Sequence, residues 1–597
     1  MQVSLGSDAV RTARLDYKWI ALSNTTLGIL MATVNSSILL IALPDIFRGI
    51  ALNPLAPANT PYFLWILMGF LLVTSVLVVS LGRIGDIYGR VRMFNLGFAI
   101  FTVFSILLAV TWLPGTSGAL WIVIMRLGQG VGGAFLFANS SAILTDAFPE
   151  NERGMAMGVQ GVAAIGGSFL GLILGGVLAP VEWHLVFWLS VPLGLFGTVW
   201  SYTKLVDNGV RTPAHIDWTG NLLFAVGLIG VLTGIVYGLQ PYGGHTMGWT
   251  KPFVLVCVLG GLAVLALFVI VETRVTDPMF RLHLFKVRAF TMGNITGLLA
   301  ALSRGGLQFI LIIWLQGIWL PEHGYSFERT PLWAGIYMIP LTVGFLIVGP
   351  LSGRLADRYG ARPFATAGIT LSGVVFLLFN LLPMTFNYVL FAILLLLVGI
   401  SMGLFFAPNV ASVMNSLPAD QRGAGAGMLN TFQNSAQVFS IGIFFTVITL
   451  GLAARLPSAL DNGLVAQGVP AAQAHQIAQL PPIGSLFAAF LGYNPIKQVL
   501  PSASAAHVSQ AHYQYLTGRG FFPDLIAGPF GHGLHLAFYM AAAVCFVGTV
   551  FSMLRGGAKS VPFGRNRTES TDLALSGAGD VAMAEAGAGS ETSPLGD

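Results

Sequence analysis

Residues 82–92 read GRIGDIYGRVR, and residues 353–363 read GRLADRYGARP. Both stretches carry the pattern Gly-Arg-x-x-Asp-x-Tyr-Gly, and each connects two long apolar segments. The copies begin 271 positions apart, at Gly82 and Gly353. Because one charged turn recurs in the same kind of place, the sequence predicts two related halves.

The apolar segments around these turns exclude a soluble fold. Hydrophobic residues make up 55% of the 597 positions and charged residues only 9%, against roughly 25% in soluble domains. Fourteen segments reach the roughly twenty residues needed to cross a hydrocarbon core. We therefore expect an all-α polytopic membrane protein. The predicted helices cover approximately residues 20–44, 62–82, 93–113, 119–145, 155–179, 185–204, 218–238, 252–271, 290–319, 332–354, 364–383, 386–408, 426–451 and 532–554.

The basic residues predict the orientation of the chain. When loops are assigned to alternate sides, 21 of the 29 Lys and Arg lie on the side of the N-terminus and six on the other side. The remaining two, Arg126 and Arg304, lie within predicted helices. By the positive-inside rule both termini are expected in the cytoplasm. The net charge of +5 is thus a topology signal, and no nucleic-acid partner is expected.

The spacing of the helices predicts five regions. They are a cytoplasmic N-terminus (1–19), a six-helix bundle (20–204), two inserted helices with their loops (205–289), a second bundle (290–554) and a disordered cytoplasmic tail (555–597). The second bundle includes a long outer loop, 452–531, whose apolar piece IGSLFAAFLGY should lie on the membrane surface or pack on the bundle. Cys257 and Cys545 lie in predicted helices and indicate neither a disulfide nor a metal site.

The two repeated turns resemble the cytoplasmic signature turn of the major facilitator superfamily. Residues 126–134, RLGQGVGGA, are similar to its helix 4 motif, with Arg126 and Gln129 in register. Helix 5 resembles the antiporter motif, although Leu172 stands where a proline is usual. The glycines of this motif are Gly158, Gly167, Gly171, Gly175 and Gly176. The helix count, IDWTG from Ile216 and DPMFRLHLF from Asp277 resemble the EmrB/QacA drug:proton antiporter subfamily.

This resemblance implies a major facilitator fold of two six-helix bundles plus two inserted helices. It also implies a monomeric exporter in the bacterial inner membrane that moves amphipathic small molecules by alternating access. A proton gradient would drive it, without a cofactor or a metal. One residue departs from the pattern, because Asn35 stands where the subfamily usually has an Asp in helix 1. A neutral amide cannot carry the coupling proton, so a lipid or metabolite carrier without a helix 1 proton site stays open.

The resemblance also suggests a gating role for the repeated turns, with tight turns and topology-setting cations as the alternative. The candidate gating residues are Gly82, Asp86, Gly89, Arg90 and Arg92 in the first copy, and Asp357, Arg358, Gly360 and Arg362 in the second. For the helix 5 glycines, a bending hinge and close helix packing are both open.

Polar residues inside the membrane are the candidates for the substrate and proton pathway, because they are costly there. Arg126 and Arg304 belong to this group, and a structural role is the alternative for Arg304. Helix 13 adds an amide stripe that faces either a cavity or neighbouring helices, formed by Asn430, Gln433, Asn434 and Gln437. His532 and His535 are expected at the membrane interface, with titration as the alternative.

The charges inside the membrane also predict the charge of the substrate, and the sequence lacks the residue arrangements that an enzyme would need. No Asp or Glu lies well inside a predicted helix, so a neutral or acidic substrate is expected. An enzyme would need a nucleophile with its base or a set of metal ligands, and the sequence shows neither arrangement.

Overall fold

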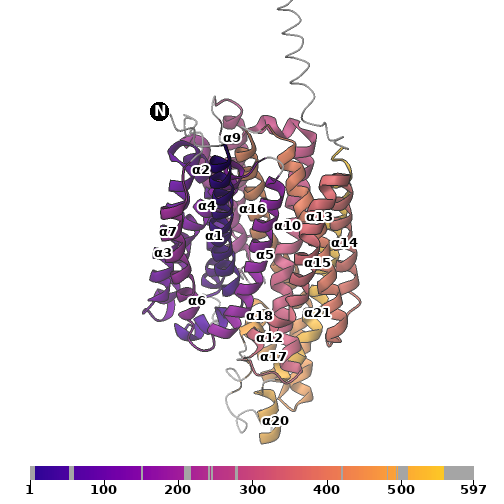
Figure 1. Ribbon diagram of the computed structural model, residues 1–597. Coiled ribbons are helices and arrows are strands. Elements are labelled where there is room, and N and C mark those ends of the chain that lie inside the picture. Colours follow the sequence, from indigo (N-terminus) through magenta and orange to yellow (C-terminus); the bar gives the residue numbers. More distant parts are fainter. Residues whose placement is uncertain are drawn as a thin grey trace, which may run out of the picture. The chain divides into compact units, whose positions relative to one another are not determined.

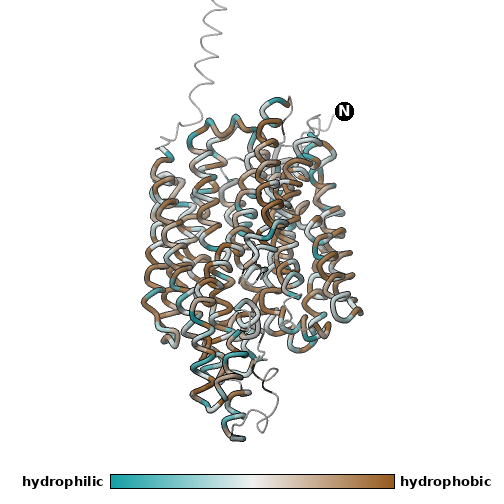
Figure 2. Tube along the Cα trace, turned by 180° about the vertical axis from the view of Figure 1, so that it is seen from behind, coloured by the Kyte–Doolittle hydropathy of each residue, from teal (hydrophilic) through white to brown (hydrophobic). Residues whose placement is uncertain are grey.

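The computed structural model describes residues 7–556, with gaps at 53–58, 150–151, 208–216, 240–241, 244–246, 276–277, 279, 328, 419–420, 480–481, 492–493, 495, 497–499, 501–508 and 519. Beyond Gly556 the expected tail lies outside the described residues, as do Ile216 and Asp277. Every long element in the described part is a helix (Figure 1). Apolar residues predominate along the helices (Figure 2), and the helical conformation lets backbone groups bond within each segment, as a membrane requires.

Fourteen helices are long and apolar enough to cross a membrane, which confirms the predicted number. The first half contains α1 (Ser7–Gly49), α2 (Thr60–Tyr88), α3 (Arg90–Ala109), α4 (Gly115–Ala147), α5 (Arg153–Leu178), α6 (Leu185–Trp188) and α7 (Ser190–Lys204). The inserted pair is α8 (Trp218–Gly238) and α9 (Pro252–Glu272). The second half contains η2 (Leu282–Lys286), α10 (Arg288–Trp314), η3 (Leu315–Trp319), α11 (Leu320–Glu322), α12 (Thr330–Tyr337), α13 (Ile339–Tyr359), α14 (Ala361–Phe379), α15 (Tyr388–Asn415), α16 (Arg422–Ala466), α17 (Ala471–Ala478), α18 (Pro482–Leu491), α20 (Gln510–Leu516) and α21 (Phe521–Met553).

The helices of the two halves pack in the same order, as the repeated turn predicts. In the first half α1 packs on α5, α4 packs on both α2 and α3, and α7 packs on α3. In the second half α10 packs on α16, α15 packs on both α13 and α14, and α21 packs on α14. The halves lie side by side (Figure 1) and meet where α2 packs on α16 and where α5 packs on α12 and α13.

The inserted helices form a pair at the edge of this seam. α8 and α9 pack on each other, and α8 also contacts α2 of the first half and α16 of the second. Asp217 caps α8, since its carboxylate accepts a hydrogen bond from the backbone N–H of Gly220 at 2.8 Å. Glu272 at the end of α9 accepts one from the backbone N–H of Phe280. The pair therefore extends the bundle without entering either half.

The segment 452–531 differs from the expected outer loop, because much of its described part is helical. α16 continues to Ala466, α17, α18 and α20 follow, and α21 begins at Phe521. The reason is an apolar stripe at a spacing of four, Leu452, Leu456, Leu460 and Leu464, each fully buried. Polar residues on the opposite face of the same helix conceal this stripe from a hydropathy average. The apolar piece forms α18, which packs on α1, α16 and η3.

The glycines of helix 5 lie mainly at a close contact with α1. A Cβ atom added to Gly171 would lie 2.1 Å from Oγ of Ser37, and one added to Gly175 would lie 2.7 Å from the carbonyl oxygen of Ile38. Gly167 meets α1 in the same way, while Gly176 lies against Leu332 of α12 in the other half. Gly158 differs, because an added Cβ would meet nothing within 4 Å. The spacing of four thus brings two backbones together, as small residues do in membranes.

We expect Gly171→Ala to destabilise the protein, because α1 and α5 must separate to admit the methyl group. Overpacking of this kind costs about 2 kcal/mol. Gly158→Ala is the matched control on the same helix, and it should leave stability unchanged or raise it by about 0.5 kcal/mol. The thermal unfolding midpoint of each variant in detergent measures both effects. Equal midpoints for the two variants would contradict the packing role, and lost transport by stable Gly158→Ala would instead indicate a hinge.

Candidate functional site

Arg126 lies in the interior of the first half and is completely buried. Its Nη1 donates a hydrogen bond to Oδ1 of Asn35 on α1 and another to Oε1 of Gln129, which lies one turn along α4. The guanidinium carbon also lies 4.8 Å from the centre of the Phe70 ring on α2, a cation–π contact. The structure therefore brings together Asn35, Arg126 and Gln129.

The hydrogen bonds continue from this arginine to two more helices. Nδ2 of Asn35 donates to Oγ of Ser190 at 2.9 Å, and Nε2 of Gln129 donates to Oγ of Ser105 at 2.8 Å. No carboxylate among the described residues forms an ion pair with Arg126. The cation is thus held by neutral amides and an aromatic face inside one half, and its Nε and Nη2 are buried without a hydrogen-bond partner in the described part.

Arg304 has a different environment in the second half. It lies on α10, and its side chain is only partly buried. Within the described residues it forms no hydrogen bond or ion pair. The four amides of the stripe, Asn430, Gln433, Asn434 and Gln437, share both properties on α16. Hydrogen bonds to other described residues therefore do not explain why these groups lie inside the membrane.

Close packing of α10 on α16 brings two of these amides near the backbone of α10. A Cβ atom added to Gly297 of α10 would lie 3.5 Å from Nε2 of Gln433, and one added to Gly305 would lie 2.9 Å from Cγ of Gln437. Arg304 precedes Gly305 in the chain, so its backbone lies one residue from this contact. The arrangement offers a guanidinium and unpaired amides, which can bind carboxylate, carbonyl and hydroxyl groups.

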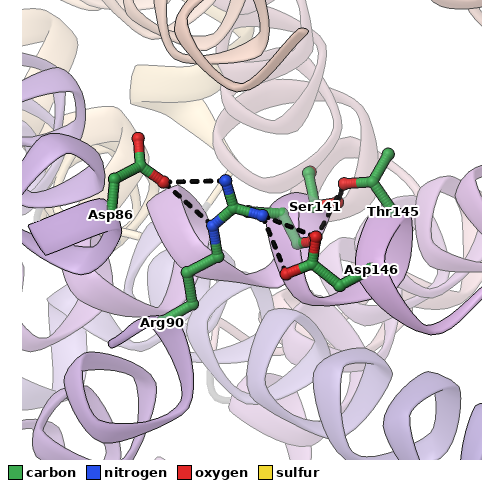
Figure 3. A network of polar contacts seen from close by, with 6 residues as sticks. Asp86, Arg90, Ser141, Thr145 and Asp146 are labelled. Carbon is green, nitrogen blue, oxygen red and sulfur yellow. Dashed lines mark hydrogen bonds and ion pairs between the residues drawn. The ribbon is translucent and has the colours of Figure 1, made fainter. Parts of the chain in front are cut away.

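The first copy of the repeated turn forms an ion-pair network at one end of the first half (Figure 3). Nε of Arg90 lies 2.9 Å from Oδ1 of Asp86, and its Nη1 lies 2.7 and 2.8 Å from the two carboxylate oxygens of Asp146. Gly89 links α2 to α3 with a φ of 109°, which favours glycine. Arg90 therefore joins α2, α3 and α4, whereas Arg92 is exposed. Sequence reasoning missed Asp146, because its partner is distant in the chain.

The second copy keeps the turn, but its described side chains form no such network. Gly360 has a φ of 88°, so the turn between α13 and α14 has the same backbone form. Ala361 occupies the position that corresponds to Arg90. Arg358 lies 5.3 Å from the centre of the Tyr359 ring, and the Asp357 side chain lies outside the described residues. The two copies thus share geometry but differ in charge pairing.

A further buried arginine was missed by sequence reasoning. Arg555 follows α21 and is only 3% exposed. Its Nη2 donates to Oδ1 of Asn409 on α15, and Nδ2 of Asn409 donates to the carbonyl oxygen of Gly293 at 3.2 Å. Burial lowers the pKa of Arg555 to about 10. Asn409, directly after the apolar predicted helix 386–408, was the signal that could have indicated a partner here.

His532 and His535, which are expected at the membrane interface, bond to neither Arg555 nor Asn409 among the described residues. Nδ1 of His535 shares a hydrogen bond of 2.8 Å with Oδ1 of Asn380, the residue that follows α14. His532 lies one turn earlier on the same helix, α21. Across the described residues, no three His, Cys, Asp or Glu side chains are placed to hold a metal ion.

The comparison with known families connects this geometry to a function. The model of the Major Facilitator Superfamily matches residues 25–441, which include the first turn, Arg126, the glycines of α5 and the second turn. The chain belongs to the major facilitator superfamily. The proton:xylose symporter XylE, a member of this superfamily, aligns over 85% of this chain and all of its own, with a TM-score of 0.50 and 14% sequence identity. That similarity supports the fold alone.

Three relatives are named for drug export, multidrug resistance and riboflavin transport. The tetracenomycin C resistance and export protein of Streptomyces glaucescens is 26% identical over 539 residues, covering 90% of this chain and 91% of the relative. The multidrug resistance protein Stp of Mycobacterium tuberculosis (strain CDC 1551 / Oshkosh) is 27% identical over 74% of this chain and 78% of its own. The riboflavin transporter RibZ of Clostridioides difficile (strain 630) is 27% identical over 72% of this chain and 87% of its own. The superfamily member described here is therefore a membrane transporter and not an enzyme.

We expect Arg90→Ala to destabilise the first half, because three helices lose their shared ion pair. The side chains are partly exposed, so the loss should be about 1 kcal/mol. Arg92→Ala removes an exposed cation of the same turn and should change stability by less than about 0.5 kcal/mol. Thermal unfolding in detergent at low and high salt distinguishes the two variants. Equal effects of the two substitutions would contradict the network.

Proposed function

We propose that this protein is an exporter that moves neutral or acidic amphipathic molecules by alternating access between its two halves, driven by a proton gradient. The observation that carries the proposal is the contrast between its two membrane arginines. Arg126 is enclosed by Asn35 and Gln129, whereas Arg304 is partly exposed and has no hydrogen-bond or ion-pair partner among the described residues. An unpaired cation inside a membrane calls for a ligand.

The chemistry around Arg304 favours an acceptor-bearing substrate. A carboxylate or phenolate would offset the desolvation of the guanidinium, and the amides of α16 could bind hydroxyl or carbonyl groups beside it. The acidic residues in the described helices lie near helix ends, among them Asp45, Asp146 and Glu272. A cationic substrate would therefore lack a counter-ion between the halves. Three relatives named for drug resistance, drug export or riboflavin transport are consistent with organic molecules of moderate size.

In the proposed orientation the protein lies in the bacterial inner membrane, with both termini of the chain in the cytoplasm. Fourteen crossings put the two ends on one side, and the excess of basic residues there favours the cytoplasm. The Arg90 network then lies at the inner end, where it would lock the first half during the cycle. We also propose that the protein acts as a monomer, with one pathway between its halves.

A second candidate is a lipid or metabolite carrier without a proton site in helix 1. The hydrogen bonds of Asn35 favour it, because this amide binds Arg126 and Ser190 where an aspartate could take up a proton. Proton coupling in the first candidate must then use another group. The two candidates differ in their response to an imposed pH gradient.

We expect Arg304→Gln to weaken transport of acidic substrates selectively, because it removes a guanidinium that lies inside a predicted membrane helix and has no partner among the described residues. Loss of one charged hydrogen bond should raise the KM for an anionic dye about tenfold. A neutral dye of the same shape should change much less, and Arg274→Gln, in the exposed segment after α9, is the control. Uptake into proteoliposomes is measured for the anionic dye, the neutral dye and a quaternary ammonium dye. Best export of quaternary ammonium dyes, unchanged in Arg304→Gln, would refute the charge argument.

We expect Asn35→Asp to make transport depend on pH in a new way. An ionised aspartate would pair with Arg126 and hold α1 against α4, so cycling should slow about tenfold at neutral pH and recover at acid pH, where the carboxyl group is neutral. Asn35→Ala removes the same hydrogen bonds without adding a titrating group, so its rate should not gain this dependence. Dye efflux from proteoliposomes after a pH jump gives the measurement. A wild-type efflux rate that does not change with the imposed pH gradient would favour the second candidate.

A further inference from the structure

The second copy of the repeated turn carries an exposed arginine, Arg362, that contacts no polar partner among the described residues. In register with the first copy, Arg362 corresponds to Val91 and Ala361 to Arg90. A shift of one residue turns a side chain by about 100° around a helix. Val91 is 7% exposed inside its half, whereas Arg362 is exposed and forms no hydrogen bond or ion pair within the described residues. The cation is therefore free to bind something outside the helix bundle.

Arg362 lies at one end of a groove of about 720 Å³ between α14 and α21. Other lining residues follow one face of α14 from its first turn onward, among them Thr366, Ala367, Leu371 and Val374, and Met553 lines it from α21. The thirteen residues from Arg362 to Val374 span roughly 18 Å of helix. That length matches one acyl chain within half of a bilayer.

The surface of the groove is apolar because its hydroxyl groups pair with each other. Oγ1 of Thr366 lies 2.8 Å from Oγ of Ser552, and Oγ1 of Thr370 lies 3.0 Å from Oγ1 of Thr549. These bonds connect α14 to α21 beneath the groove. Val374 and Met553 are 41% and 51% exposed, so the groove presents methyl and methylene groups to its surroundings.

The charged end of the groove suits a phosphate group. Arg362 lies in the first turn of α14, which carries no acidic residue, and its N-cap, Gly360, offers no side chain to the free N–H groups. Helix N-termini attract anions through these groups. A second cation lies at the same end of α21, because Nε of Arg288 donates to the carbonyl oxygen of Leu554 at 2.7 Å. One end of the apolar groove thus combines the Arg362 guanidinium with a helix N-terminus, and Arg288 lies at the adjoining end of α21.

We infer that this groove binds an anionic glycerophospholipid as a resident lipid, distinct from the transported substrate. The phosphate binds Arg362 and the first turn of α14, and one acyl chain lies along Ala367, Leu371 and Val374. The same end of the bundle carries the excess of basic residues, the side on which anionic headgroups attract cations. A second copy of the chain fits this surface poorly, since a twofold contact would bring like charges together.

Native mass spectrometry of the delipidated full-length protein tests this assignment. Phosphatidylglycerol and phosphatidylcholine with identical acyl chains are titrated separately, and inorganic phosphate is added in a third arm. Phosphatidylglycerol should bind about fivefold more tightly, as expected for one cation at a membrane surface. Arg362→Gln should reduce this preference to near unity, while Arg358→Gln, an exposed arginine outside the groove, should keep it.

Filling the groove tests the acyl-chain part independently. Ala367 is exposed, so Ala367→Trp should fold normally and lower the retention of both lipids. Unchanged phosphatidylglycerol preference in Arg362→Gln would overturn the assignment, as would displacement of the lipid by inorganic phosphate alone. A change of oligomeric mass in Ala367→Trp, with lipid retention unaffected, would instead identify a protein-binding surface. Because transport is not the readout, this test is independent of the proposed substrate.

Discussion

A hydrocarbon environment offers no water to peptide groups, and the rest of this structure depends on that constraint. Each crossing segment must form its backbone hydrogen bonds internally, so the chain folds as helices. Other interactions must then hold the helices together. Lipid is as apolar as a leucine side chain, so close backbone contact and polar pairing take the place of hydrophobic burial. Gly167, Gly171 and Gly175 allow such contact between α5 and α1, and Gly305 and Gly306 allow it between α10 and α16.

These two helix pairs occupy equivalent places in the two halves, yet their polar residues differ. Beside α1 and α5, Arg126 is held by amides and Phe70 within the first half. At the α10–α16 contact, Arg304 and the amide stripe have no hydrogen-bond partners among the described residues. The repeated turns differ in the same sense, because Arg90 pairs with Asp86 and Asp146 whereas the second copy places its arginine one residue later. A duplicated framework thus carries different polar pairs in its two halves.

The fold could be predicted almost entirely from the sequence because membrane insertion depends on local quantities. Apolar length located the fourteen crossings, and repeated residues located the two halves. Prediction failed at segment 452–531, where Leu452, Leu456, Leu460 and Leu464 bury one face of a helix whose other face is polar. It also missed Asp146 and Arg555, since each gains its meaning from a partner far away in the chain.

The sequence by itself determined the helices, the repeat and the family, because hydropathy and motif spacing are properties of neighbouring residues. Tertiary structure alone decided which charges are paired. Asn35 could be identified as a departure, but only the packing of α1 on α4 showed that it binds Arg126. Likewise Arg126 and Arg304 look equivalent as isolated cations in apolar helices. Their difference arises from the side chains that other helices bring within hydrogen-bonding distance, which no local pattern records.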